Sequence, residues 1–133
     1  MLHKKYRINV SDLHGVGLFS DEYIKRGEVV YTASPMLDIN ITQEQFDTLD
    51  IREKQEIKYW GHWNEIEEKW HVDFDASRYI NHSFRSNLTQ GEECERLVLV
   101  ATRDIRIGEE LTQNYLEFEN LEDLKARGIP TGK

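Results

Sequence analysis

Three short segments of the sequence concentrate side chains that can bind a ligand or take part in catalysis. The central one, SRYINHSFRSN at residues 77–87, places Arg78, Asn81 and His82 among few large apolar residues. Asn81 offers an amide with two donors and one acceptor, and a neutral His82 ring offers one of each. Such groups need hydrogen-bond partners when they are buried. The segment is therefore a polar loop bonded to its own backbone or a ligand-binding segment, and its spacing alone leaves both open.

The other two segments carry glycine and tyrosine. HGVGLFS begins at His14, and Gly15 and Gly17 remove two side chains from neighbouring positions, which permits unusual backbone angles and close approach of a ligand to the main chain. GEELTQNY ends at Tyr115, where a strand is expected to lead from an acidic turn to a phenol. Taken singly, a Gly-x-Gly pair most often shapes a turn, and a tyrosine at a strand end most often packs at the edge of a core. Neither segment alone indicates an activity.

Two further groups of residues could carry chemistry but lack a partner in the sequence. His71 and Asp73 flank one residue of an expected strand, so they share a face, but no third ligand stands nearby. Cys94 lies among three glutamates, whose negative charge disfavours the reactive thiolate. We therefore expect neither a metal site nor a cysteine nucleophile.

Short strands are expected to position these segments. Tyr6, Ile8 and Val10 alternate with polar residues, and the runs GVGLFS and GEVVYTA are β-prone and punctuated by glycine. ERLVLVATRD predicts the strongest strand, because its apolar residues are continuous. The phrase I-[KR]-x-G-E occurs at Ile24 and again at Ile105, which predicts two similar hairpin turns rather than a repeat array.

Helix signals are confined to an insert at about residues 42–60 and to the C-terminal tail, residues 116–133. Thr42 begins a T-x-x-Q capping box and Asp50 begins a D-x-x-E capping box, which predicts two short helices. Asn120 caps LEDLKAR, a short helix with acidic residues in its first turn. Short strands with a helical insert predict a mostly β or α+β fold.

Composition limits the class of protein and its partners. The chain has 133 residues and one cysteine, so we expect a single domain over residues 1–133 without a disulfide framework. It lacks the apolar run of a signal peptide or a membrane span, which predicts a cytoplasmic or nuclear protein. The formal charge of -8 repels nucleic-acid backbones and favours a basic, Lys- and Arg-rich protein or peptide partner.

In this order, the three segments resemble the motifs of the SET-domain protein lysine methyltransferases. That family carries a G-x-G near the N-terminus, R-[FY]-x-N-H-S-x-x-x-N in the second half and E-[EL]-[LI]-T-x-x-Y near the end. Here these are Gly15 with Gly17, residues 78–87 and residues 109–115, and the I-x-x-G-E turns are also similar. The resemblance spans about residues 14–118 and is to compact bacterial and viral members without zinc-binding flanks.

The resemblance implies a SET-domain fold of small curved β-sheets with a short helical insert and a C-terminal pseudoknot, in which the N-H-S and tyrosine segments are threaded. It implies S-adenosyl-L-methionine as methyl donor and no metal. Tyr115 becomes the catalytic tyrosine. The residues assigned to cofactor binding are His14, Gly15, Val16, Gly17, Arg78, Asn81, His82 and Tyr115.

The same resemblance implies a narrow channel for the substrate lysine. Tyr59 is similar to the second channel tyrosine, with a catalytic role, although Tyr31 is a rival for that position. Phe118 takes the aromatic position that limits how many methyl groups fit. Since the zinc flank is absent, the tail at 116–133 or a second subunit of a homodimer would close the channel. Phe84 and Ser86 stand where the family often has Cys and Pro, which alters the loop.

The sequence therefore supports three functions. The first is an S-adenosylmethionine-dependent protein-lysine N-methyltransferase that acts on a basic protein tail, such as that of a histone or a histone-like DNA-binding protein. The second is a catalytically silent SET-like interaction module, and the third an enzyme that methylates a small amine or a translation factor. The presence of Asn81, His82 and Tyr115 together favours the first, because a silent module has no physical need for that combination.

Overall fold

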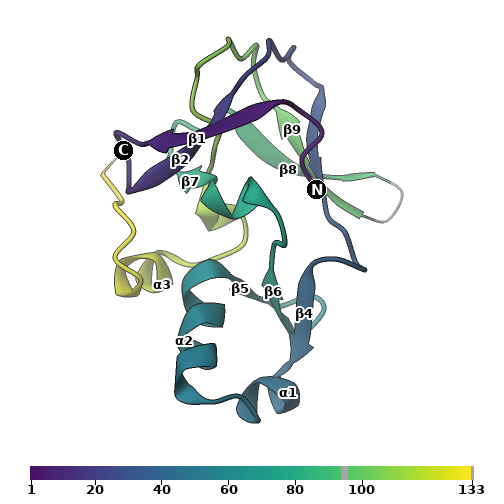
Figure 1. The fold of residues 1–133 in the computed structure, drawn as a ribbon, viewed down its shortest axis with the longest axis vertical. Coiled ribbons are helices and arrows are strands. Elements are labelled where there is room, and N and C mark those ends of the chain that lie inside the picture. The colour runs from purple at the N-terminus through teal and green to yellow at the C-terminus, as the bar shows by residue number, and fades with distance from the viewer. Residues whose placement is uncertain (94–95, 133) are drawn as a thin grey trace.

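The structure is a computed structural model that describes residues 1–93 and 96–132; Cys94 lies outside the described residues (Figure 1). It is built from three small sheets, as the predicted β-rich class requires. A hairpin pairs β1 with β2, a second sheet has the order β3-β9-β8-β10-β7, and a third has the order β4-β6-β5. The strands are β1 (Tyr6–Val10), β2 (Val16–Ser20), β3 (Val29–Thr32), β4 (Ile39–Thr42), β5 (His62–Asn64), β6 (Lys69–Val72), β7 (Asn81–His82), β8 (Leu88–Glu93), β9 (Arg96–Ala101) and β10 (Thr112–Gln113).

The helices lie where the sequence predicts them. The elements are α1 (Gln43–Asp47), α2 (Ile51–Trp60) and α3 (Leu121–Ala126), with 3₁₀ turns η1 (Ala76–Tyr79) and η2 (Tyr115–Glu117). Both predicted capping boxes are confirmed, because Thr42 and Asp50 each accept the backbone N–H three residues on while the N3 side chain bonds back. Asn120 caps α3 as predicted. Over the described residues, no helix is both long and apolar enough to cross a membrane.

The last strand of the large sheet is threaded between two earlier ones. β10 lies between β8 and β7 and runs parallel to both. Because β7 and β8 follow each other in sequence, the loop at 83–87 must cross β10. Asn87, which is 1% exposed, joins the loop to the segment that it crosses. Its Nδ2 donates to the Glu110 carbonyl at 2.8 Å, and its Oδ1 accepts from the Thr112 N–H at 2.9 Å. The threading that the resemblance implies is thus present, although ordinary rules of chain connection disfavour it.

The two I-[KR]-x-G-E turns bond to each other. The N–H of Ile24 donates to the carbonyl of Ile105 at 2.9 Å, and the N–H of Ile105 donates back at 2.8 Å. Both isoleucine side chains are fully buried. Gly27 and Gly108 end the turns at φ values of +88° and +90°, which favour glycine. The repeated phrase therefore builds one paired structure in the core.

The hydrophobic core lies under the large sheet, whereas the helical insert packs on the small sheet β4-β6-β5. The core cluster consists of Leu18, Ile24, Val30, Tyr31, Ile80, Leu88, Leu99, Ala101, Ile105 and Leu111. In the insert, Phe46 stacks on Trp70 with ring centroids 4.8 Å apart, and α2 buries none of its side chains. Figure 1 shows the insert and the sheet β4-β6-β5 at one end of the molecule, with α3 beside α2. A cavity lies between this end and the large sheet.

Candidate active site

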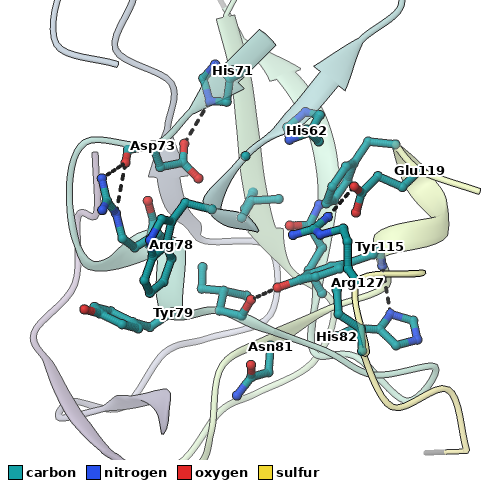
Figure 2. Close-up of a pocket in the computed structure, with 18 of the residues that line it drawn as sticks. His62, His71, Asp73, Arg78, Tyr79, Asn81, His82, Tyr115, Glu119 and Arg127 are labelled. Atoms are coloured by element: carbon teal, nitrogen blue, oxygen red, sulfur yellow. Dashed lines mark hydrogen bonds and ion pairs between the residues drawn. The ribbon is translucent and has the colours of Figure 1, made fainter. Parts of the chain in front are cut away.

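All three sequence segments meet at one cavity of about 170 Å³ (Figure 2). The glycine segment contributes residues 14–16, the N-H-S segment contributes Arg78, Asn81 and His82, and Tyr115 comes from the last segment. These residues are far apart in sequence. The pairing of β10 with β7 places the last segment beside the N-H-S segment, and the Asn81 side chain bonds to the glycine segment. Of the predicted site residues, Tyr59 and Phe118 also line this cavity.

Asn81 joins two of these segments through its side chain. Its Nδ2 donates to the carbonyls of His14 and Val16, each at 3.0 Å, and to Glu110 Oε1 at 2.9 Å. The side chain is nearly buried, so these acceptors are the partners that its amide protons require. Asn81 therefore fixes the main chain of the glycine segment at the cavity wall. The predicted role as a direct cofactor contact stays a prediction.

The two glycines have different surroundings, and the predicted contact of Gly17 with the cofactor stays a prediction. Gly15 has φ +50° and open space where a side chain would begin, so its main chain is accessible from the cavity. Gly17 does not line the cavity. A Cβ on Gly17 would lie 2.1 Å from Glu110 Oε1, so a side chain at this position would clash with that carboxylate.

Glu110 is a residue that the sequence reasoning did not single out. Its Oε1 also accepts from Ser11 Oγ at 2.7 Å, in addition to the Asn81 bond. The carboxylate thus links the N-terminal hairpin, the N-H-S segment and the last segment. In the sequence it was only one of two adjacent acidic residues in a turn, and nothing local distinguished it from its exposed neighbours.

His82 carries a buried donor without a partner. Its Nδ1 accepts the N–H of Tyr115 at 3.0 Å, so in a neutral ring the proton resides on Nε2. Burial lowers the pKa of His82, which keeps the ring neutral at pH 7. Nε2 is buried and has no hydrogen-bond partner among the described residues. Since buried donors are almost always bonded in native proteins, this one is suited to an acceptor on a ligand.

Tyr115 begins the turn η2 immediately after β10, rather than ending the strand as predicted. Its hydroxyl donates to the carbonyl of Ile80, and burial raises the pKa of its phenol far above the ordinary value. The phenol is therefore protonated at neutral pH. Its ring lies 5.4 Å from the His82 ring and 5.3 Å from the Phe118 ring, so it stands between the N-H-S segment and the tail.

Both rival tyrosines line the cavity, but their hydroxyl groups differ. Tyr31 is 3% exposed and its hydroxyl donates to Asp73, so that hydroxyl is already engaged. Tyr59 is 55% exposed and packs edge-on against Trp60, and its hydroxyl has no hydrogen-bond partner among the described residues. Tyr59 is the tyrosine better placed to meet a substrate arriving from outside.

Arg78 lines the cavity, although its guanidinium is held by the protein. Nη2 donates to the carbonyl of Asp73 at 2.8 Å, and the guanidinium lies over the ring of Trp60, 5.3 Å from its centroid. Figure 2 shows Arg78 and Asp73 joined at one side of the cavity. The contacts fit a residue that shapes the wall, and its predicted binding of the cofactor stays a prediction.

A third potential metal ligand lies near His71 and Asp73, contrary to the sequence expectation. Ligand atoms of Asp38, His71 and Asp73 lie within 4.8 Å of one another. Burial lowers the pKa of His71, but the hydrogen bond and charge of Asp73 outweigh it, so the pKa lies above its ordinary value. Ser34 and Phe74 donate their N–H groups to Asp38. Hydrogen bonds within the protein already engage both carboxylates of the group, and we assign no ion to it.

An open groove of about 1410 Å³ adjoins the cavity on the side of the tail. It shares several lining residues with the cavity, among them Tyr59, His62, Phe118, Glu119 and Arg127, whereas Tyr115 and His82 line the inner cavity only. We call these five shared residues the neck. The acidic residues of the groove are Glu65, Glu67, Glu117, Glu119 and Asp123.

The sequence reasoning missed three of the neck residues. Arg127 looked like a charge in the last turn of a helix, and Glu119 looked like one of several acidic residues in the tail. His62 stood between aromatic residues with no apparent partner. Arg127 and His62 are recognised through contacts with segments that are distant in sequence, whereas Glu119 is recognised through its pairing with Arg127 eight positions away.

Residues 15–116 match the SET domain family. The chain belongs to the SET domain family. The match covers most of the chain and includes all three segments that form the cavity. The small sheets, the few helices and the threaded C-terminal strand are the SET fold.

Solved structures agree with this assignment. Polycomb Repressive Complex 2 of Chaetomium thermophilum, bound to GSK126, contains a chain 29% identical to this one, with TM-score 0.67; the match covers 98% of this chain and 18% of that one. A structure of ctPRC2 in an autoinhibited conformation, bound to S-adenosylmethionine, contains a chain that is 30% identical to this one, with TM-score 0.64. The match covers 96% of this chain and 18% of that one. The present SET domain thus spans less than a fifth of those chains.

A Plasmodium falciparum protein described as a putative histone methyltransferase has TM-score 0.60 and 21% identity, over 86% of this chain and 95% of that one. At this identity the likeness concerns the fold. It is also a comparison in which nearly the whole of the other chain is covered.

Proposed function

We propose that this SET domain is an S-adenosylmethionine-dependent protein-lysine N-methyltransferase that acts on a basic protein tail, such as that of a histone or histone-like protein. The observation that carries the proposal is the direct bond between the N–H of Tyr115 and Nδ1 of His82, beside the Gly15 main chain, in one cavity. It joins the predicted catalytic residue to the predicted cofactor-binding segment. The S-adenosylmethionine bound to ctPRC2 supports the same cofactor here.

The residues present fit a sulfonium cofactor of this kind. His82 Nε2–H lacks an acceptor in the protein, and Gly15 exposes main chain without a side chain in the way. Residues 14–16, Asn81 and His82 would hold the cofactor. When bound, it supplies an activated methyl group on a cationic sulfur.

The remaining task of the protein is to present a neutral amine in line with that methyl group. A lysine with its ordinary pKa near ~10.4 is neutral in about one molecule in 2,500 at pH 7, a cost of roughly 4.6 kcal/mol. Aromatic walls from Tyr115, Phe118 and Tyr59 exclude water and lower that cost, because burial favours the neutral amine. Fixing the amine in a narrow sleeve supplies much of the rest.

Tyr115 acts as a hydrogen-bonding group rather than as a base in this proposal. Its phenol stays protonated at neutral pH, since burial raises its pKa. While its proton is donated to the carbonyl of Ile80, its oxygen lone pairs are free to accept a hydrogen bond from the amine and to orient it.

The acidic groove supports a cationic substrate. Five acidic side chains line it, and Tyr59 and Phe118 form its boundary with the cavity. Such a surface attracts Lys- and Arg-rich segments and repels nucleic acid.

The test is incubation of the purified protein with methyl-labelled S-adenosylmethionine and histones, histone-like proteins or a small amine, followed by mass spectrometry of the products. We expect label on lysine side chains of basic proteins. Labelling of a small amine alone would favour the third function considered above. Binding of the cofactor without transfer to any basic protein would favour the silent module.

A further inference from the structure

The ion pair between Arg127 and Glu119 stands in the neck, where the inner cavity meets the outer groove. Both residues line the two spaces, and Figure 2 shows them facing each other beside Tyr115. Arg127 comes from the C-cap of α3, and Glu119 from the segment that leads to that helix. The pair therefore forms part of the boundary between the groove and the cavity that contains Tyr115.

The pair is buried but incompletely bonded. Arg127 Nη1 donates to Glu119 Oε1, and Nη2 donates to the carbonyl of Tyr59 at 3.0 Å. The Glu119 side chain is 8% exposed and that of Arg127 is 21% exposed. Nevertheless Glu119 Oε2 and Arg127 Nε are buried and have no hydrogen-bond partner among the described residues.

Unmet bonds at a buried pair are costly, because the atoms have lost water without gaining a partner. This cost has an explanation if the two side chains rearrange when a ligand binds and the unbonded atoms then gain partners. A lysine ammonium has three donors on a compact group, so it can bond a carboxylate oxygen that a planar guanidinium leaves unused. Oε2 of Glu119 is such an oxygen, and it lies on the path that the proposed function assigns to the substrate lysine.

We propose that the Arg127–Glu119 pair is a gate on the lysine channel, in which the ammonium group of the substrate competes with Arg127 for Glu119. This inference rests on the proposed function, since it assumes that a lysine side chain enters through the neck. In the closed arrangement described here, Arg127 occupies Glu119. In the open one, Glu119 receives the substrate at the mouth of the channel, while the methyl transfer itself takes place deeper, beside Tyr115.

A gate and a simple structural clamp predict different effects of substituting Arg127 and Glu119 on the affinity for the substrate. If the pair only fastens the tail, removing either charge weakens the protein and impairs substrate binding in both variants. If it is a gate, Arg127→Met removes the competitor and improves binding of lysine, whereas Glu119→Gln removes the acceptor and impairs it. Methionine preserves most of the apolar length of arginine, and glutamine preserves the shape of glutamate.

The experiment measures binding of two fluorescently labelled arginine-rich peptides by anisotropy, one with a single lysine and one with norleucine in its place. We expect Arg127→Met to tighten both peptides by about threefold or more, because it opens the neck, and Glu119→Gln to weaken only the lysine peptide by a similar factor. Arg7→Met and Asp21→Asn, which change the same charges at an exposed pair on the N-terminal hairpin, should change neither affinity. Thermal melting of each variant checks that it is folded.

Weaker binding of the lysine peptide in both variants would overturn the gate, as would equal effects of Glu119→Gln on the two peptides. If either variant fails to fold, Arg127→Gln or Glu119→Met replaces it, because each also removes the charge and keeps a side chain of similar length, and the same signs are expected. The readout does not depend on turnover. Absence of methyl transfer by the wild-type protein would therefore remove the proposed function, while the binding pattern would still decide the gate.

Discussion

At the scale of single residues, the cavity separates side chains that hold its walls from side chains that face a ligand. Asn81 and Arg78 donate hydrogen bonds to carbonyl groups of the protein, whereas the buried Nε2–H of His82 has no partner among the described residues. Tyr115 does both, because its proton is bonded to Ile80 while its oxygen can still accept. Substitutions at these positions should therefore affect different measured quantities.

Tyr115→Phe removes only the phenolic oxygen. We expect kcat to fall by roughly 10²-fold or more, about 2.7 kcal/mol of transition-state stabilisation, because the amine loses the group that orients it. Cofactor affinity should change little, and stability should fall by about 1 kcal/mol with the loss of the bond to Ile80. Steady-state kinetics and calorimetry with the cofactor measure these effects. Tyr59→Phe is the control, and an undiminished kcat in Tyr115→Phe would shift the catalytic assignment to another residue.

Asn81→Ala should act on the cofactor through the glycine segment. Its amide holds the carbonyls of His14 and Val16 and pairs with Glu110, so the alanine variant frees the segment and leaves a carboxylate with one donor fewer. We expect affinity for S-adenosylmethionine to drop by about tenfold or more, equal to about 1.4 kcal/mol, together with a lower Tm. Calorimetry of the variant gives both values. Asn9→Ala, at an exposed position of β1, should leave affinity unchanged, and a tight-binding Asn81→Ala variant would contradict the assigned role.

His62 should make the protein less stable in acid. Burial and the neighbouring His71 lower the pKa of His62 to about 4. The unfolded chain has a pKa near ~6.5, so stability is fully present above that value and is lost as pH falls from about 6.5 toward 4. We expect the wild type to lose about 2 to 3 kcal/mol more unfolding free energy between pH 7 and pH 4 than His62→Phe does. Urea titrations at several pH values test this, and parallel curves for the two proteins would refute it.

At the scale of elements, the sequence predicted what is determined locally. The capping boxes at Thr42 and Asp50 and the cap at Asn120 depend on residues three positions apart, so the pattern located all three helices. The long apolar run likewise located β9. β7 and β10 have two residues each, too few for any periodicity. The threading of their segments was expected from the family resemblance alone, and their parallel pairing is a finding of the structure.

The candidate site likewise contains some residues that the sequence predicted and others that only the fold brings together. Asn81, His82 and Tyr115 could be named beforehand because their motifs are contiguous. Glu119 with Arg127, and Asp38 with His71, are pairs made by folding between segments whose sequences carry no mark of each other. The clash that a side chain at Gly17 would make was also hidden, since it depends on where the carboxylate of Glu110 lies.

The closing element α3 offers a matched pair of leucines. Leu124 is fully buried, whereas Leu121 is 39% exposed on the same helix. Leu124→Ala should cost about 2 to 5 kcal/mol of stability and, because α3 carries Arg127 to the neck, should also reduce kcat/KM. Leu121→Ala should cost less than about 1 kcal/mol. Denaturation and kinetics of both variants test whether the docking of α3 is required, and equal activity of the two would show that it is not.

At the scale of the whole molecule, charged side chains are distributed differently over the outer groove and the inner cavity. The chain carries a formal charge of -8, and acidic side chains line the outer groove. The lining of the inner cavity combines aromatic rings and neutral polar groups with a few charged residues, namely Asp73 and Arg78 on one side and the Arg127–Glu119 pair at the neck. Long-range attraction and local desolvation therefore act at successive points along one path.

This arrangement predicts a salt dependence confined to binding. Raising the salt from about 0.05 M to about 0.3 M shortens the screening length to well under ~10 Å, so KM for a basic peptide should rise severalfold while kcat stays nearly constant. The double variant Glu65→Lys/Glu67→Lys reverses charge in the groove, and Glu44→Lys/Asp47→Lys makes the same change on α1, outside it. If the groove guides the substrate, the first variant should raise KM and flatten its salt dependence much more than the second. Equal effects of the two variants on KM would mean that net charge alone attracts the substrate, because reversing charge on α1 would then weaken binding as much as reversing charge in the groove that leads to Tyr115.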